Sequence, residues 1–164
     1  MEEAEIRESI AQLERVWGRV RGGESPPPAA EKQDGAAALG ALIDAQERAA
    51  SRCRALSRLT RGRAASQLLS FAAEHRREAR ELQEQFFLLT GDSRPLRREA
   101  PEASGLLLGL RRAWTEEAAL QRDLTRIAET AADDALRTLC LEARRRSAQR
   151  QARLRALLRS CMRE

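Results

Sequence analysis

Two residues that can bind metals or carry protons lie three positions apart on a face that the sequence predicts to be buried. His75 is the only histidine of the chain, and Glu78 follows it within the stretch FAAEHRREARELQEQFFLLTG (71–91). Both fall on the apolar stripe, at helical spacing, that is formed by Leu68, Phe71, Ala72, Ala79, Leu82, Phe86 and Leu89. An imidazole and a carboxylate at this spacing could ligate a metal ion, transfer a proton, or serve as hydrogen-bond partners inside a core.

Four other polar residues interrupt apolar stripes elsewhere in the chain: Gln46, Glu117, Ser147 and Arg150. Each lies near the middle of its expected helix, and in an antiparallel bundle the helix middles lie at one level. We therefore expect all six residues to meet in a central polar layer. Burying a carboxylate without a partner costs several kcal/mol. A metal ion or a cation of the protein must then balance Glu78 and Glu117.

The elements that would position these residues are helices. Aromatic residues make up 3% of the 164-residue chain, tyrosine is absent, and no stretch shows sustained period-two alternation. Amphipathic segments cover about 36–59, 64–89, 104–130 and 135–162, with short breaks after the first and third and a longer link, GDSRPLRREAPEASG, between the second and third. This wiring predicts an all-α protein, an antiparallel four-helix bundle over residues 36–164.

An additional amphipathic helix is expected at residues 1–21, followed by the Pro/Gly-rich linker GGESPPPAAEKQDG (22–35). We expect this helix to dock on its own bundle or on a second subunit. The first residues, MEEAEIRESIAQ, do not resemble a signal peptide, and no apolar run approaches membrane-spanning length. The cytoplasm is therefore the expected location, with no membrane partner.

Charge and cysteine content narrow the function further. The formal charge is +5, almost all of it from arginine, and the charges are spread along every expected helix, which favours a solvated surface. The most basic segment, EARRRSAQRQARLRALLRS, could lie along nucleic acid, but it carries no aromatic residue for base stacking. Three widely separated cysteines with no CxxC indicate neither a zinc knuckle nor a disulfide framework.

The two expected helical hairpins, 36–89 and 104–162, are similar to each other in where polar residues interrupt the apolar stripes. This similarity, together with LQEQFFLLTG at the end of the second bundle helix, resembles the rubrerythrin-type branch of the ferritin-like superfamily. A VWGRV segment (16–20) ahead of a proline linker is similar to small bacterial proteins of this type. The resemblance implies a di-iron site built from a Glu on the first and third helices and a Glu-x-x-His pair on the second and fourth. It also implies iron-dependent redox activity, such as peroxide reduction or ferroxidase chemistry.

This chain departs from that ligand pattern at most positions. The first-helix Glu is replaced by Gln46, the second pair has the reversed order His75 and Glu78, and only Glu117 matches. The fourth-helix pair is replaced by two residues that are not ligands, Ser147 and Arg150.

We therefore expect a non-catalytic scaffold or interaction protein, a homodimer without a cofactor, in which Arg150 neutralises the buried acids. The alternative is a mononuclear site for one divalent Fe, Mn or Zn ion at His75, Glu78 and Glu117, with a possible redox role. The second alternative is nucleic-acid binding through arginine.

Overall fold

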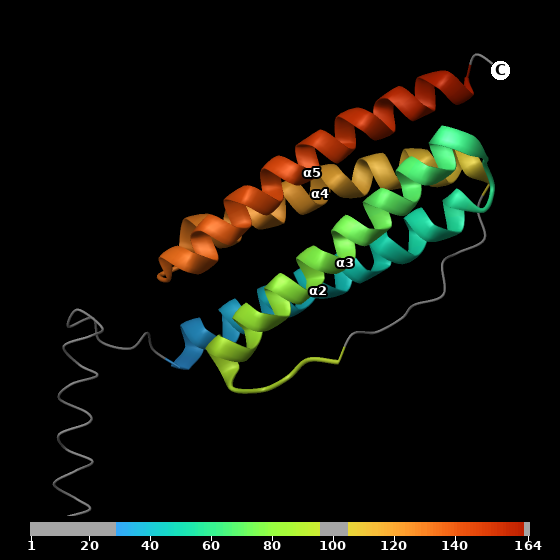
Figure 1. Ribbon diagram of the computed structural model, residues 1–164. Coiled ribbons are helices and arrows are strands. Elements are labelled where there is room, and N and C mark those ends of the chain that lie inside the picture. Colours follow the sequence, from blue (N-terminus) through green and yellow to red (C-terminus); the bar gives the residue numbers. More distant parts are fainter. Residues whose placement is uncertain (1–28, 96–104, 163–164) are drawn as a thin grey trace, which may run out of the picture. The chain divides into compact units, whose positions relative to one another are not determined.

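The computed structural model describes residues 29–95 and 105–162, with side chains from residue 34 onward. This part of the chain contains four helices and no strand: α2 (Ala29–Ser57), α3 (Gly62–Thr90), α4 (Leu106–Thr130) and α5 (Asp134–Cys161). Figure 1 shows α2 beside α3 and α4 beside α5, each pair joined by a short turn. The prediction of an all-α four-helix bundle is confirmed. The predicted helix at 1–21 lies outside the described residues, as does the linker up to residue 28.

The first bundle helix starts earlier than the sequence predicted. We placed its beginning at residue 36, but α2 begins at Ala29. The prolines of the linker all precede this point, and AAEKQ, which follows them, consists of good helix formers. Gly35 is accommodated within the helix, where a glycine costs about 1 kcal/mol relative to alanine.

Local signals in the sequence explain two of the other helix ends. Gly91 follows α3 with φ 77°, and its N–H donates to the carbonyl oxygen of Phe87. A left-handed residue of this kind satisfies a carbonyl group that the last turn would otherwise leave free, and glycine adopts it without strain. Asp133 caps α5 by accepting a hydrogen bond from the N–H of Ala135.

Two apolar clusters form the core of the compact unit that begins at Lys32. One cluster joins Leu39, Leu42 and Ile43 of α2 to Leu82, Leu120, Leu124, Ile127, Ala128, Cys140 and Ala143. The other joins the second half of α2 and of α5 to the first half of α3 and of α4, through Cys53, Leu56, Leu68, Phe71, Ala72, Leu110, Ala113 and Leu154. The residues of the expected polar layer fall between these two clusters in every helix. Among the described helices, none is long and apolar enough to cross a membrane.

Candidate functional site

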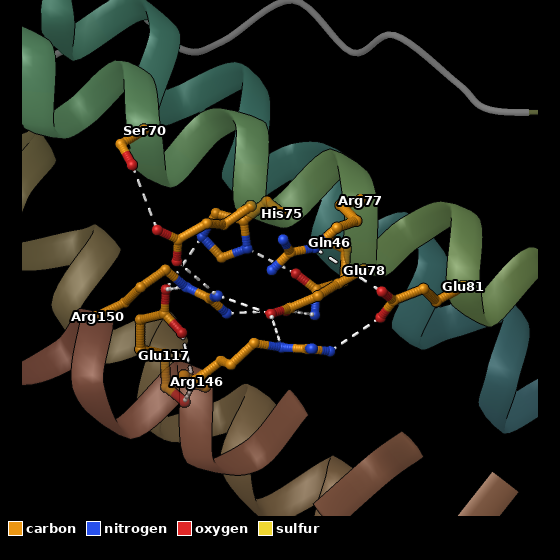
Figure 2. Close-up of polar contacts among 11 residues, drawn as sticks. Gln46, Ser70, His75, Arg77, Glu78, Glu81, Glu117, Arg146 and Arg150 are labelled. Atoms are coloured by element: carbon orange, nitrogen blue, oxygen red, sulfur yellow. Dashed lines mark hydrogen bonds and ion pairs between the residues drawn. The ribbon is translucent and has the colours of Figure 1, made fainter. Parts of the chain in front are cut away.

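The structure places all six residues of the central polar layer inside the bundle. Figure 2 shows Gln46, His75, Glu78, Glu117 and Arg150 close to one another. Each is between 0 and 2% exposed. α2 contributes Gln46, α3 contributes His75 and Glu78, α4 contributes Glu117, and α5 contributes Ser147 and Arg150. Every helix of the bundle therefore supplies at least one polar side chain to the same level of the core.

Arg150 is the centre of this layer. Its Nη1 and Nη2 atoms donate to Oε1 and Oε2 of Glu78, at 2.8 and 2.9 Å, in a bidentate pair. Its Nε atom donates to Oε1 of Glu117 at 3.0 Å. One guanidinium group thus links two carboxylates from different helices, and charge-assisted bonds of this kind are roughly twice as strong as neutral ones. Burial alone would lower the pKa of Arg150, but the hydrogen bonds that it donates to Glu78 and the negative charges of Glu117 and Glu78 outweigh this effect and raise it.

His75 is held between Gln46 and Glu117. The amide nitrogen of Gln46 donates to Oε2 of Glu78 at 2.8 Å, so the amide oxygen of Gln46 faces Nδ1 of His75, at 2.6 Å. An oxygen acceptor at this distance requires a hydrogen on Nδ1. Nε2 of His75 lies 3.0 Å from Oε1 of Glu117.

The protonation state of the ring follows from Glu117. Burial alone would raise the pKa of this carboxyl, but the hydrogen bonds and positive charges of His75 and Arg150 lower it to about 2. Independently of His75, Glu117 accepts hydrogen bonds from Nε of Arg150 and from the hydroxyl group of Ser147, and these favour its ionised form. An ionised carboxylate has no hydrogen to donate, so its 3.0 Å contact with His75 requires a hydrogen on Nε2. With hydrogens on both nitrogens, His75 is an imidazolium cation. Ser147 completes the shell of Glu117 by donating to its Oε2 at 2.5 Å.

This protonation state makes the buried layer electrically neutral. Two cations, His75 and Arg150, face two anions, Glu78 and Glu117, and the ion pairs between them are 2.8 to 3.0 Å long. Buried ions are tolerated when they are paired and their remaining hydrogen-bonding groups are satisfied. Gln46 and Ser147 supply those remaining bonds.

The sequence reasoning missed a second ring of charge around the layer. Nε of Arg146 donates to Oε1 of Glu78 at 3.0 Å, and its Nη2 donates to Oε2 of Glu81 at 2.9 Å (Figure 2). Glu74 lies 3.4 Å from Nη1 of Arg150. The signal was available: Arg146 precedes Arg150 by one helical turn, and Glu74 and Glu81 flank Glu78 on the same face of α3. These three residues are partly exposed and connect the layer to the surface.

Two acidic residues that are adjacent in sequence to layer residues, Glu47 and Glu116, differ in burial. Glu47 is in fact buried, with 6% exposure, because the covered face of α2 is wider than one stripe and includes Gln46, Ala49 and Ala50 as well. Glu116 is partly exposed, and it pairs with Arg52 at 3.0 Å rather than with the layer.

The donors of the layer are not arranged for a metal ion. Both nitrogens of His75 carry hydrogens, and an imidazole ligates a metal only through a free lone pair. The carboxylates of Glu78 and Glu117 are turned toward Arg150, a fixed cation with no lone pair to donate. Within 29–95 and 105–162, no group of three or more His, Cys, Asp and Glu side chains is placed to hold a metal ion. The di-iron centre that the family resemblance implies does not fit these residues.

Thiol chemistry is disfavoured at the neighbouring cysteine. Burial, followed by the negative charge of Glu117, raises the pKa of Cys53 to about 12. A thiolate is the nucleophilic form of cysteine, so Cys53 stays protonated and unreactive at neutral pH.

Comparison of the chain with protein-family models, with curated proteins and with solved structures found no match. The functional argument therefore depends on the geometry of the layer and of the molecular surface.

Proposed function

We propose that this protein is a ferritin-like, rubrerythrin-type bundle in which a salt-bridge layer replaces the di-iron centre, and that it acts as a non-catalytic scaffold or interaction protein. The observation that carries the proposal is the position of Arg150. Its guanidinium lies between the carboxylates of Glu78 and Glu117 and donates hydrogen bonds to both. Since arginine stays protonated at any working pH, this cation cannot leave the layer by titration.

The connectivity of the helices supports the ferritin-like assignment. The second half of α2 packs with the first half of α3, and the second half of α5 with the first half of α4, so each short turn joins an antiparallel hairpin. The first halves of α3 and α4 pack in the same cluster, so these two helices run in the same direction. In ferritin-like folds one long crossover joins two helices that run in the same direction.

The beginning of the link between α3 and α4 already points back along the bundle. Arg94 donates to Asp44 of α2 at 2.6 Å, and its carbonyl oxygen accepts a hydrogen bond from Gln83 of α3 at 2.5 Å. The link has 15 residues between Thr90 and Leu106, which can reach about 50 Å when extended. A 29-residue helix such as α3 is about 43 Å long, so the link has enough reach.

The residues of the layer correspond to the di-iron ligand positions of the family pattern, with most of the ligands replaced. Glu117 keeps the ligand expected on the third helix, whereas Gln46, Ser147 and Arg150 occupy positions where the family pattern has Glu, Glu and His. Each replacement now makes a hydrogen bond within the layer: Gln46 to Glu78, and Ser147 and Arg150 to Glu117. We infer that these substitutions act together, because each new side chain donates a hydrogen bond to a carboxylate oxygen of Glu78 or Glu117 that would otherwise need another partner.

The test is metal analysis of untagged protein purified without chelators, compared with the variants Glu117→Ala and Glu129→Ala. Glu129 is an exposed acid on the same helix and serves as the control. We expect less than stoichiometric Fe, Mn and Zn in all three proteins, and no peroxidase or ferroxidase activity. A stoichiometric ion that is retained in Glu129→Ala but lost in Glu117→Ala would establish instead the mononuclear alternative at His75, Glu78 and Glu117.

We also propose that the protein is a homodimer, as expected for a bundle that acts through its surface. Sedimentation velocity over a range of protein concentrations measures this directly. If the protein is a monomer at all concentrations, the homodimer proposal is wrong. That result would not affect the proposal that a salt-bridge layer replaces the di-iron centre.

A further inference from the structure

The charges of the bundle are segregated along its axis. Three segments lie beyond the polar layer on the same side, at residues 48–73, 105–115 and 151–162, and they pack around one apolar cluster. Together they contain eleven arginines and no Asp or Glu. The segments on the other side of the layer, 34–45, 82–95 and 118–142, contain nine acidic residues and four arginines. We call the first group of segments the basic end.

We expected from the sequence that charges would be spread along every helix. In the folded bundle, however, the arginines without neighbouring acids gather at one end. Each helix carries both signs. However, α2 has arginines and no acid after Glu47, α5 has arginines and no acid between residues 143 and 161, α3 has no acid before Glu74, and α4 has none before Glu116. The fold turns these halves toward the same end. Most of the arginines there are exposed, and within the described part of the chain Arg58, Arg61 and Arg63 make no ion pair.

Two helix N-termini add positive potential at the basic end. α3 begins at Gly62 and α4 at Leu106, and neither has a side-chain cap or an acidic residue in its first turn. The free backbone N–H groups and the helix dipole make such an N-terminus favourable for a phosphate group. The C-termini of α2 and α5 also lie at this end, and there Arg54 and Arg159 stabilise the last turns. That role accounts for two arginines, and two more, Arg52 and Arg112, pair with Glu116, which borders the basic end on α4.

Large apolar side chains are exposed among these arginines. Leu59 lies in the turn between α2 and α3, Leu108 in the first turn of α4, and Met162 at the end of α5, with exposures of 52, 63 and 64%. Trp114 is also partly exposed on α4, at 38%. Within these three segments the exposed leucines are accompanied by arginines and by no Asp or Glu, and Glu116, which borders them on α4, is paired with Arg52 and Arg112. Exposed leucines beside arginines are typical of a surface that contacts anionic lipid.

We propose that the basic end docks on the surface of a phospholipid bilayer that carries anionic headgroups. In this arrangement the arginines and the two helix N-termini bind headgroup phosphates, and Leu59 and Leu108 enter the boundary between headgroups and acyl chains. Nucleic acid fits less well, because it would leave these leucines exposed, and Trp114 is the only aromatic side chain at this end that is partly exposed for base stacking. The proposal departs from the expectation of no membrane partner, which rested on the absence of a spanning segment. It does not depend on what the polar layer holds.

Vesicle co-sedimentation of the full chain tests the proposal, with phosphatidylcholine vesicles against vesicles that also contain phosphatidylglycerol. We expect binding only to the anionic vesicles. Each arginine near an anionic surface contributes about a fivefold gain in partitioning. The double variant Arg58→Gln/Arg61→Gln should thus weaken binding by about 25-fold. Leu108→Ser should weaken it by about tenfold and make the remaining binding more sensitive to salt.

Matched controls come from outside the basic end. Arg122→Gln/Arg145→Gln removes two exposed arginines, and Leu88→Ser removes an exposed leucine at the far end of α3. Both should bind anionic vesicles as the wild type does, and circular dichroism checks that every variant is folded. Absent binding to the anionic vesicles, equal binding to uncharged vesicles, or an equal loss in the controls overturns the proposal. Displacement from vesicles by duplex DNA, with no effect of Leu108→Ser, would assign the basic end to nucleic acid instead.

Discussion

Replacing Arg150 by methionine tests the central claim about the polar layer. Methionine keeps much of the length and volume of the side chain, but it removes three hydrogen bonds of 2.8, 2.9 and 3.0 Å to Glu78 and Glu117. Both carboxylates are at most 2% exposed. The variant removes the one cation that they share, and leaves Glu117 with His75 and Ser147, and Glu78 with Gln46 and Arg146. Breaking a buried ion pair from one side costs about 3–5 kcal/mol. For a chain of this size such a loss lowers the melting temperature by about 10 °C or more.

The assay is urea unfolding followed by circular dichroism, with the free energy of unfolding compared at constant m-value. Arg145→Met is the matched control, since Arg145 lies on the same helix and is exposed, and it should change the free energy by less than about 0.5 kcal/mol. The variant Glu78→Leu/Glu117→Leu/Arg150→Met removes Arg150 together with the two buried carboxylates that it contacts, while Arg146 keeps its pair with Glu81. It should recover part of the lost stability, because a buried ion cluster contributes little beyond what apolar packing can supply. If Arg150→Met and Arg145→Met lose the same small amount, Arg150 does not neutralise the layer.

Two further predictions concern protonation in the layer. The pKa of Glu117 is lowered from 4.5 in the unfolded chain to about 2 in the folded protein, so its ionised form stabilises the fold above pH 4.5 by about 3 kcal/mol, and this contribution is lost as the pH falls toward 2. The gap in unfolding free energy between wild type and Glu117→Gln should therefore narrow over this pH range, and a constant gap would contradict the lowered pKa. The second prediction uses the single histidine: nitrogen NMR of untagged, ¹⁵N-histidine-labelled protein at neutral pH should show hydrogens on both ring nitrogens of His75. Two nitrogen shifts typical of a neutral tautomer would refute the imidazolium and the charge balance that depends on it.

The sequence by itself determined the helices and the residues that had to be paired. Composition and the 3.6-residue period predicted four helices, because apolar residues that recur at this spacing can be buried only on one side of a helix. The interruptions of those stripes named six polar residues, and the solvation cost of Glu78 and Glu117 required a cation beside them. Helix α2 begins before the predicted boundary, because glycine and polar residues after Pro28 resemble a linker and yet are compatible with a helix.

The tertiary structure alone decided which partners meet and where the charge collects. Arg146, Glu74 and Glu81 join the layer because long side chains reach across the gap between α3 and α5, and periodicity within one helix carries no information about that reach. The two roles of Glu117, toward His75 and toward Arg150, likewise depend on the packing of three helices around it. The basic end is the clearest case. Its arginines come from three segments that are far apart in the sequence, 48–73, 105–115 and 151–162, and only the directions in which the four helices run bring these acid-free segments together.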